Sequence, residues 1–267
     1  MSWLMTTENK VKPCFAYAGG KTQLLKHILP LIPEHSRYVE PFAGGLAVLL
    51  AKKQCNVEAI NDLSSDLTTF YRVLRFHKDA LIAELATLPN SREIFDETVR
   101  TEPTTDLQRA ARFFYLQTSS FQSNRKYWGR GRDRNHGLDL RRHRKLLEDV
   151  SARLQGVYIE NKDWLGVSQY WDSTDTFHFF DPPYITGEAS SYDAFQREDM
   201  QLLADHAKTL KGKFIITTDD SEPCREIFAD FEFQQVPIRY GSKSVKGKKT
   251  PAMGNFLNPF SLQLDQH

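Results

Sequence analysis

The sequence predicts an α/β fold with a mostly parallel sheet and a helical segment inserted into it. Apolar, β-rich stretches alternate with helical patterns at both ends of the chain, and such alternation is typical of strands joined by crossover helices. Between roughly residues 67 and 155 the strand signals disappear and helical patterns take over. With 267 residues, 40% hydrophobic and 26% charged, the chain can bury a sizeable core like an ordinary globular protein.

The strands are predicted from short apolar runs, at residues 38–42, 57–61, 157–161, 177–180 and 214–217. The first two are each followed by a helical pattern, over residues 45–53 and 63–76, and residues 197–210 carry apolar side chains along one helical face. The tail between residues 231 and 260 alternates apolar and polar residues around a glycine-containing middle. This alternation predicts a terminal antiparallel hairpin.

The inserted segment is predicted to consist of helices and one projecting loop. Apolar residues recur at helical spacing in three stretches, residues 80–87, 106–118 and 140–154. Residues 119–137 are polar and rich in glycine and arginine, which does not suit a regular helix. We therefore expect a loop or hairpin there.

The composition excludes several classes of protein. No apolar stretch approaches the roughly 18 to 20 residues of a membrane span, and the N-terminus lacks the basic start and apolar stretch of a signal peptide. Cys14, Cys55 and Cys224 stand apart without CxxC spacing, so neither a disulfide framework nor a zinc site is indicated. We expect a cytoplasmic protein with reduced, structural cysteines, no bound metal and no membrane contact.

The basic residues are concentrated in two segments, although the net charge is only +1. Residues 109–145 contain eleven Arg and Lys against two acidic residues, and residues 233–264 contain five basic residues and no acidic one. The rest of the chain is acidic on balance. Such local basic segments suit contacts with phosphate groups.

The sequence Asp181-Pro182-Pro183-Tyr184 directly follows the predicted strand at residues 177–180. Ligands of open α/β sheets bind outside the carboxyl ends of the strands, so chemistry is expected here. The two prolines fix φ and remove two N–H donors, leaving a stiff loop that offers carbonyl oxygens and a carboxylate. Such a loop suits an aromatic amine: Asp181 would accept one N–H, the carbonyl of Pro182 the other, and Tyr184 would stack on the ring. A Pro-Pro turn that merely ends a strand is the alternative.

A glycine turn between the first predicted strand and its helix offers a second place for a ligand. Gly44 and Gly45 let a ligand approach the backbone closely, but the turn lacks the GxGxxG pattern of nicotinamide-binding proteins. Asp62 follows the next strand about 20 residues later, where an acid can accept hydrogen bonds from a ribose diol. A structural turn and a helix N-cap at Asp62 are the alternatives, and Asp66 is expected to serve the helix itself.

Four short blocks follow one another along the chain: Phe-Ala-Tyr-Ala-Gly-Gly-Lys at 15–21, the glycine turn at 38–45, the acidic block at 61–66, and the block at 179–184 that ends in Asp-Pro-Pro-Tyr. In this order they resemble the amino-group DNA methyltransferases, and among these the Dam-type, D12 class of N6-adenine-specific enzymes. The resemblance implies a Rossmann-like, seven-stranded S-adenosylmethionine-dependent methyltransferase core, formed by residues 1–66 and 156–267. It also implies an inserted helical target-recognition subdomain at residues 67–155.

The resemblance further implies S-adenosylmethionine as the cofactor and assigns residues to it. Lys21 would supply a cation near the cofactor carboxylate, with an exposed lysine on a Gly-Gly turn as the alternative. Asp163 would accept the adenine amine of the cofactor, and Trp164 would pack on the ring or lie in the core. The implied cofactor-binding residues are Tyr17, Lys21, Glu40, Phe42, Gly44, Asp62, Asp163 and Asp181. The implied catalytic residues are Asp181, Pro182, Pro183 and Tyr184.

The inserted segment is the part expected to bind DNA. Flipping a base out of the duplex costs a few kcal/mol and stacking on one ring returns roughly 1 to 3 kcal/mol, so contacts with phosphates and neighbouring bases must supply the rest. Residues 141–145 are expected to form only a solvated helix face. The expected DNA-binding residues are Arg125, Lys126, Arg130, Arg132 and Arg134, with Lys246 and Lys248 as a second patch.

The predicted function is site-specific methylation of the N6 amine of a flipped adenine in double-stranded DNA, by a monomeric enzyme. Cytosine-N4 methylation is the nearest alternative, because that amine needs the same acceptor loop. A DNA-binding homologue that has lost turnover is another alternative, although Lys21, Asp181 and Tyr184 argue against it. Methylation of RNA or of protein glutamine is less favoured, because the basic insert has no evident use on a free glutamine side chain.

Overall fold

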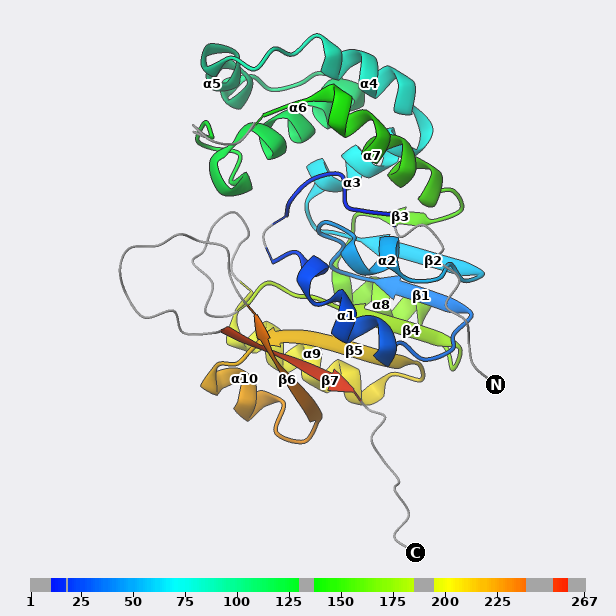
Figure 1. Cartoon of the computed structure of the whole chain (residues 1–267). Helices are drawn as coiled ribbons and strands as arrows, with labels where there is room; N and C mark the ends of the chain where they lie inside the picture. The colour runs from blue at the N-terminus through cyan, green and yellow to red at the C-terminus, as the bar shows by residue number, and fades with distance from the viewer. Residues whose placement is uncertain (1–10, 18, 130–136, 185–194, 239–251, 259–267) are drawn as a thin grey trace, which may run out of the picture. The chain divides into compact units, whose positions relative to one another are not determined.

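The computed structural model describes residues 11–17, 19–129, 137–184, 195–238 and 252–258 (Figure 1). The chain divides into two compact units. The helical unit comprises Met1–Leu25, Gly44–Gln54 and Ser64–Ile159, and the sheet unit comprises Lys26–Ala43, Cys55–Leu63 and Glu160–His267. The bounds of these units differ from those of the two predicted domains, and the assignment of a core and a target-recognition subdomain stays a prediction.

The sheet unit is built on a sheet whose central strands run parallel. Among the described residues seven strands lie in the order β3-β2-β1-β4-β5-β7-β6. β1 pairs in parallel with β2 and β4, and β4 with β5, whereas β7 runs antiparallel to β5 and β6. The predicted α/β class with a parallel sheet and the terminal antiparallel hairpin are both confirmed. The bounds are β1 Arg37–Glu40, β2 Val57–Asn61, β3 Tyr158–Glu160, β4 Thr176–Phe180, β5 Lys213–Asp219, β6 Glu232–Ile238 and β7 Ala252–Asn258.

Burial explains why these stretches form parallel strands. All five residues of β4 are buried, and β5 is buried from Phe214 to Thr218. Parallel strands are covered on both faces and therefore appear in the sequence as continuous apolar runs. The core beside them contains Phe180 together with Met200 and Leu203 of α9. The helices of this unit are α8 Trp164–Trp171, α9 Arg197–Thr209 and α10 Glu222–Ile227, with α1 Leu25–Ile28 and the short η2 Leu29–Leu31 at its beginning.

The helical unit packs around a cluster of aromatic rings. The ring centroid of Phe15 lies 5.4 Å from that of Phe70 in α3 and 5.6 Å from that of Phe113 in α6. Phe70 in turn stacks on Phe114 with 5.5 Å between centroids. The segment before Lys21 is therefore tied to the helices by apolar contacts. The elements of the unit are η1 Lys21–Gln23, α2 Ala47–Ala51, α3 Ser65–Phe76, α4 Lys78–Ala86, α5 Arg92–Arg100, α6 Asp106–Ser119, η3 Phe121–Ser123 and α7 Leu140–Arg153.

All six predicted helices are confirmed to within two residues at each end, namely α2, α3, α4, α6, α7 and α9. α5, α8 and α10 were not predicted. α5 has nine residues and buries only Phe95, and α10 has just six residues, so both are short and weakly buried helices. Short or weakly buried helices depend on the fold around them rather than on their own pattern.

The strand order creates a topological switch point between β1 and β4. From β1 the chain crosses to β2 on one side, whereas β4 and β5 lie on the other side. In open α/β sheets, ligands bind outside the carboxyl ends of the strands at such a point. The residues that follow these ends are Pro41 after β1, Asp62 after β2 and Asp181 after β4. All three belong to the sheet unit.

Asn61 ties the carboxyl ends of β1 and β2 to the segment that follows β3. Its Nδ2 donates to the carbonyl oxygens of Pro41 and Lys162, at 3.0 Å each, and its Oδ1 accepts from the Lys162 N–H at 2.8 Å. Its own carbonyl accepts from the Ala43 N–H at 2.8 Å. Asn61 is only 1% exposed, so these bonds replace its contacts with water.

Asn61→Asp is expected to destabilise the protein by about 2 to 4 kcal/mol. The carboxylate has the size of the amide, but it replaces the N–H donor by an oxygen that can only accept, opposite two carbonyl oxygens. Urea unfolding of the full chain measures the loss. Asn124→Asp is the matched control, since the Asn124 side chain only accepts hydrogen bonds among the described residues, from the N–H groups of Lys126 and Tyr127. Equal unfolding midpoints for Asn61→Asp and the unmodified chain would contradict the prediction.

A buried polar network joins β4 to α8 and α9. The Ser168 hydroxyl lies 3.3 Å from His178 Nδ1 and 2.8 Å from His206 Nε2. His178 Nε2 lies 3.3 Å from Asp172 Oδ1. Burial lowers the pKa of His178 to about 4, because the loss of solvation of the imidazolium outweighs the attraction of Asp172. His178 is therefore neutral in the folded protein at neutral pH.

Stability is expected to decrease as the pH falls from about 6.5, the ordinary pKa of histidine, to about 4. In this window the unfolded chain binds a proton at His178 that the folded chain does not bind, whereas above it both states are neutral and no pH dependence arises. The shift corresponds to about 3 kcal/mol. Urea midpoints between pH 4 and 7 check this. His178→Gln should flatten the slope, the exposed His77→Gln should not, and an unchanged slope in His178→Gln would refute the assignment.

Candidate active site

The Asp181-Pro182-Pro183-Tyr184 loop leaves the carboxyl end of β4, as the sequence predicts. Pro182 is buried, and the other three residues are half-buried. Asp181 Oδ1 accepts a hydrogen bond of 2.6 Å from the hydroxyl of Thr217 in the neighbouring strand β5. The loop therefore presents a carboxylate that the sheet holds in place, and neither proline contributes an N–H donor beside it.

Two carboxylates lie buried at the ends of the neighbouring strands. Glu40, the last residue of β1, is 2% exposed, and Asp62, directly after β2, is 8% exposed. The hydroxyl of Tyr38 donates to Glu40 Oε2 at 2.8 Å. Burying a carboxylate is unfavourable unless its oxygens accept hydrogen bonds, so both positions suit groups that donate them. The N-cap position of α3 belongs to Ser64, which corrects the alternative of a helix cap at Asp62.

Aromatic rings from three segments of the sheet unit gather around Phe42, two residues after β1. The ring of Phe42 lies 5.8 Å from that of Trp164 and 5.7 Å from that of Phe195. Trp164 also meets the core rings of Phe180, at 6.4 Å, and His206, at 5.8 Å. Trp164 is thus partly buried and packs against the core at the beginning of α8, while its alternative role of packing on the cofactor ring stays a prediction.

Asp163 is exposed and forms the N-cap of α8. Its Oδ2 accepts a hydrogen bond from the Gly166 N–H at 3.1 Å. Capping a helix in this way is the ordinary structural role of an aspartate at such a position. The predicted contact of Asp163 with the adenine amine of a cofactor stays a prediction.

In the helical unit, Tyr17 packs directly on the glycine turn. A Cβ atom on Gly44 would lie 3.2 Å from Tyr17 Cδ1, and one on Gly45 would lie 3.2 Å from Tyr17 Cβ. The Gly44 carbonyl accepts a hydrogen bond from the Tyr71 hydroxyl at 2.7 Å. The Tyr17 hydroxyl is buried and has no hydrogen-bond partner among the described residues. The glycines thus make room for Tyr17, a contact that the sequence did not predict.

Lys21 is buried rather than exposed, with only 4% of its surface accessible. Its Nζ donates to the carbonyl oxygen of Gly19 at 2.7 Å. Gly19 has a φ of +74°, a conformation that favours glycine. The alternative of an exposed lysine on a Gly-Gly turn is therefore wrong, and the chain places a cation inside the helical unit.

The predicted loop at residues 119–137 begins as a short hairpin. Ser120 and Trp128 form an antiparallel bridge, and the Phe121 N–H donates to the Tyr127 carbonyl at 2.8 Å. The side chain of Trp128 packs on Phe95 of α5, with 5.3 Å between ring centroids. Phe121 and Tyr127 are 51% and 69% exposed. The hairpin of residues 120–128 is thus anchored on one side and presents two aromatic rings to solvent.

The basic residues predicted to contact DNA differ in their surroundings. Lys126 is exposed on the 120–128 hairpin, whereas Arg125 is half-buried and its guanidinium lies 5.1 Å from the centre of the Phe113 ring. Part of the Arg125 side chain is therefore engaged by the helical unit itself. The remaining predicted DNA-binding residues lie outside the described residues: Arg130, Arg132, Arg134, Lys246 and Lys248.

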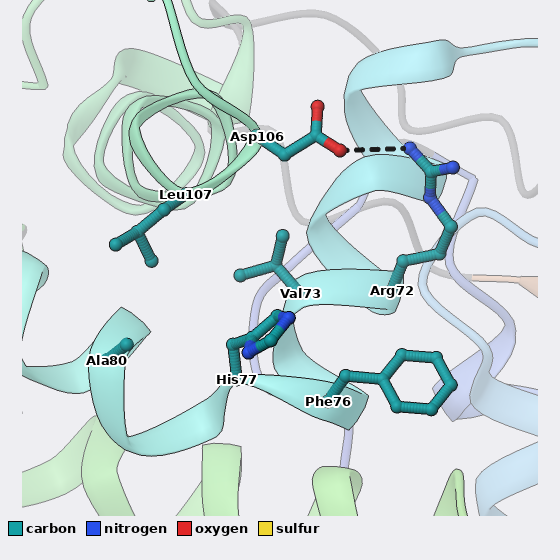
Figure 2. A pocket seen from close by; sticks show the side chains of 7 residues that line it. All are labelled: Arg72, Val73, Phe76, His77, Ala80, Asp106 and Leu107. Atoms are coloured by element: carbon teal, nitrogen blue, oxygen red, sulfur yellow. Dashed lines mark ion pairs between the residues drawn. The ribbon is translucent and has the colours of Figure 1, made fainter.

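A cavity of about 460 Å³ in the helical unit is lined by none of the predicted site residues (Figure 2). Its wall includes an ion pair between Arg72 and Asp106, with 3.5 Å between nitrogen and oxygen, whose side chains are more than half exposed. Such exposed pairs contribute little. The cavity offers no pair of carboxylates, so nothing assigns the reaction to it. The lining residues are Arg72, Val73, Phe76, His77, Ala80, Asp106 and Leu107.

Within the part of the chain that the structure describes, no three His, Cys, Asp or Glu side chains gather in a way that could hold a metal ion. No helix there is long and apolar enough to cross a membrane. Cys14, Cys55 and Cys224 are free thiols. Burial raises the pKa of the Cys14 and Cys224 thiols, which disfavours thiolate chemistry at both.

Three polar side chains that fix candidate site residues or their neighbours within each unit were not predicted from the sequence. They are Thr217 beside Asp181, Asn61 at the end of β2, and Tyr71 against the Gly44 carbonyl. Each is a buried polar residue that directly follows a buried apolar one in the sequence. That pattern is the signal that could have identified them, because a buried polar group requires a partner.

Comparison with known proteins points to the same chemistry. The sequence pattern of the D12 class N6 adenine-specific DNA methyltransferases matches residues 17–240. The type II methyltransferase M1.LlaDCHI of Lactococcus lactis subsp. cremoris is 30% identical over an alignment that spans 88% of this chain and 91% of that protein. The type II methyltransferase M.CviBI of Paramecium bursaria Chlorella virus NC1A is 25% identical over 89% of this chain and 94% of its own.

The DNA N-6-adenine-methyltransferase of Escherichia phage P1 is 28% identical over 91% of this chain, which corresponds to 35% of that longer protein. The match at residues 17–240 includes the glycine turn, Asp62 and the Asp181-Pro182-Pro183-Tyr184 loop. The resemblance predicted from the four short blocks is confirmed. The chain belongs to the D12 class N6 adenine-specific DNA methyltransferase family, and it is an enzyme that methylates adenine in DNA.

Proposed function

We propose that this enzyme uses S-adenosylmethionine to methylate the N6 amine of an adenine flipped out of duplex DNA, with Asp181, Pro182, Pro183 and Tyr184 as the catalytic loop. The observation that supports this most directly is the place of Asp181. It follows the buried strand β4 beside the switch point of the sheet, and its carboxylate is held by Thr217. An anchored acceptor at the carboxyl end of a central strand is what an amine substrate requires.

The catalytic loop acts on an amine whose lone pair is delocalised into the adenine ring. Asp181 accepts one N–H and the carbonyl of Pro182 accepts the other, so that the nitrogen becomes pyramidal and its lone pair is available. Tyr184 stacks on the flipped base. After the transfer the methylated nitrogen is positively charged, and it becomes neutral by losing one proton to Asp181 or to solvent.

The ends of the strands in the sheet unit fit the proposed cofactor. When bound, S-adenosylmethionine supplies an electrophilic methyl group. The buried carboxylates of Glu40 and Asp62 suit the hydroxyl and ammonium donors of such a molecule, and Phe42 offers an apolar ring next to Glu40. Asp163 keeps its proposed role toward the adenine amine of the cofactor in addition to its role as the cap of α8.

For Tyr17, Lys21 and Gly44, in the helical unit, the proposal follows the family resemblance of the N-terminal block and the glycine turn. Two observations within that unit support a ligand. The Tyr17 hydroxyl is buried without a partner among the described residues, and Lys21 is a buried cation. The assignment of Lys21 to the cofactor carboxylate follows the resemblance, and an ammonium group suits a carboxylate.

The finer architecture that we propose is a Rossmann-like methyltransferase core, residues 1–66 and 156–267, with a target-recognition subdomain inserted at residues 67–155. The parallel strands β1, β2, β4 and β5 support the core. The insert is supported by the succession of α3 to α7 between β2 and β3, where the described residues contain no named strand.

We propose that the 120–128 hairpin contacts DNA. Its exposed Lys126 suits a phosphate, and its exposed Phe121 and Tyr127 suit the faces of bases. Arg125 rests on Phe113, which limits the directions in which its guanidinium can point. The same role for Arg130, Arg132 and Arg134, and for Lys246 and Lys248, is proposed from the basic composition of their segments.

Asp181→Ala is expected to abolish methyl transfer while leaving DNA affinity within a few fold, because the variant loses an acceptor for the amine but none of the proposed phosphate contacts. Transfer of labelled methyl groups to duplex DNA, followed by digestion to nucleosides, measures the product. The exposed Asp175→Ala serves as the control. Wild-type turnover by Asp181→Ala would refute the catalytic role of the loop, and N4-methylcytosine without N6-methyladenine would refute adenine as the target.

Arg130→Gln combined with Arg132→Gln is expected to weaken DNA binding and to flatten its dependence on salt. Each lost phosphate contact lowers the slope of log affinity against log salt by about 1, so the double variant should lose about 2. Titrations at several salt concentrations measure the slope. Arg142→Gln combined with Arg144→Gln, on the exposed face of α7, is the matched control. If the slope changed equally in both double variants, Arg130 and Arg132 would have no specific role in DNA binding.

A further inference from the structure

One polar side chain of β5 contacts the catalytic aspartate without belonging to the catalytic loop. The Thr217 hydroxyl lies 2.6 Å from Asp181 Oδ1 and 3.4 Å from the Phe180 carbonyl oxygen. A hydroxyl carries a single proton, and 2.6 Å is the length expected of an O–H donor on a carboxylate. The Thr217 hydroxyl therefore donates its one hydrogen bond to Asp181.

The register of the sheet fixes this contact. β4 and β5 pair in parallel with Phe180 beside Ile216. Asp181, the first residue after β4, therefore lies beside Thr217, the next residue of β5. On its other side β5 pairs with β7, where Thr217 lies opposite Phe256. Thr217 is 1% exposed, and a buried β-branched side chain has few rotamers. The hydroxyl is thus a rigid donor held by strands on both sides.

We propose that Thr217 is a positioning residue for methyl transfer, an inference that rests on the proposed role of Asp181 as the acceptor of the amine. An aspartate carboxylate turns about two bonds, and a hydrogen bond on Oδ1 fixes its plane and with it the lone pairs of Oδ2. Without that bond the carboxylate spends time in orientations that do not accept the adenine N–H. Thr217 acts through Asp181, by keeping the acceptor in the productive geometry.

The neighbouring Thr218 provides an internal comparison. It is also 1% exposed, and its hydroxyl lies 3.0 Å from the sulfur of Cys224. Because successive residues of a strand face opposite sides, Thr218 points away from the side on which Thr217 meets Asp181. Removing either hydroxyl disturbs one buried hydrogen bond of β5, but only one of the two bonds belongs to the catalytic carboxylate.

Thr217→Val exchanges the hydroxyl for a methyl group of nearly the same size. In single turnovers with labelled S-adenosylmethionine and long, unmethylated duplex DNA, the rate of methyl transfer should fall about 10- to 100-fold, the effect of one hydrogen bond to a charged group. The KM for S-adenosylmethionine and the affinity for DNA should stay within about twofold. Thr217→Ser restores the donor and should recover most of the rate, and Thr218→Val should keep it within about twofold.

Transfer by Thr217→Val at the unmodified rate overturns the positioning role, and so does a Thr217→Ser variant as slow as Thr217→Val. Asp181→Ala, measured alongside, separates this outcome from a failure of the proposed function. An active Asp181→Ala removes the catalytic role of the loop, whereas an inactive Asp181→Ala with a fully active Thr217→Val removes only the role of Thr217. If thermal unfolding shows that Thr217→Val is not folded, Thr217→Ala is measured in the same way.

Discussion

The parallel pairing of β4 with β5 brings Phe180 beside Ile216, and the geometry of the proposed catalytic loop depends on that register. One residue further along, a carboxylate meets the buried hydroxyl of Thr217. A slip of one residue would turn the side chains of a strand to the opposite face, and Asp181 would then lose its contact with the Thr217 hydroxyl. The buried apolar residues of both strands prevent this slip. Apolar packing thus determines the position of a polar contact.

Exposure decides which polar groups of the sheet unit can take part in chemistry. Ser168, His178 and Asp172 are residue types that hydrolases use, and they are hydrogen-bonded in series. Ser168 and His178 are 0% exposed, however, so no substrate can reach them. The network instead joins β4 to α8 and α9 inside the sheet unit. Asp181 stands one residue beyond a buried strand and keeps part of its surface exposed. The end of a central strand combines rigid support with access, which the middle of the strand cannot do.

Local patterns in the sequence were sufficient for the features that are encoded within a few residues. The bounds of β2 agree at both ends, and α6 begins at the predicted Asp106, where Thr105 caps the helix. The place of the Asp-Pro-Pro-Tyr loop at the end of a strand was predicted because the apolar strand and the loop are contiguous in the sequence, whereas the catalytic role of the loop stays a proposal. The burial of Lys21 and the contact of Tyr17 with Gly44 were not predicted, since both depend on residues brought together by folding. The partner of Asp181 lies 36 residues away, and no local pattern identifies it.

An acceptor loop of this chemistry can bind the amine of either base, so the choice of the target base must depend on other contacts. Adenine N6 and cytosine N4 are both exocyclic amines with two N–H groups, and a carboxylate with a carbonyl oxygen accepts either of them. Discrimination between bases, and between sequences, requires contacts with ring edges and with flanking base pairs, which need donors as well as acceptors. The loop around Asp181 offers acceptors and two prolines, whereas the 120–128 hairpin carries an exposed lysine and exposed rings. In the proposed mechanism, the register of β4 and β5 therefore governs how fast the methyl group is transferred, and residues outside the loop, among which we propose the hairpin, govern where.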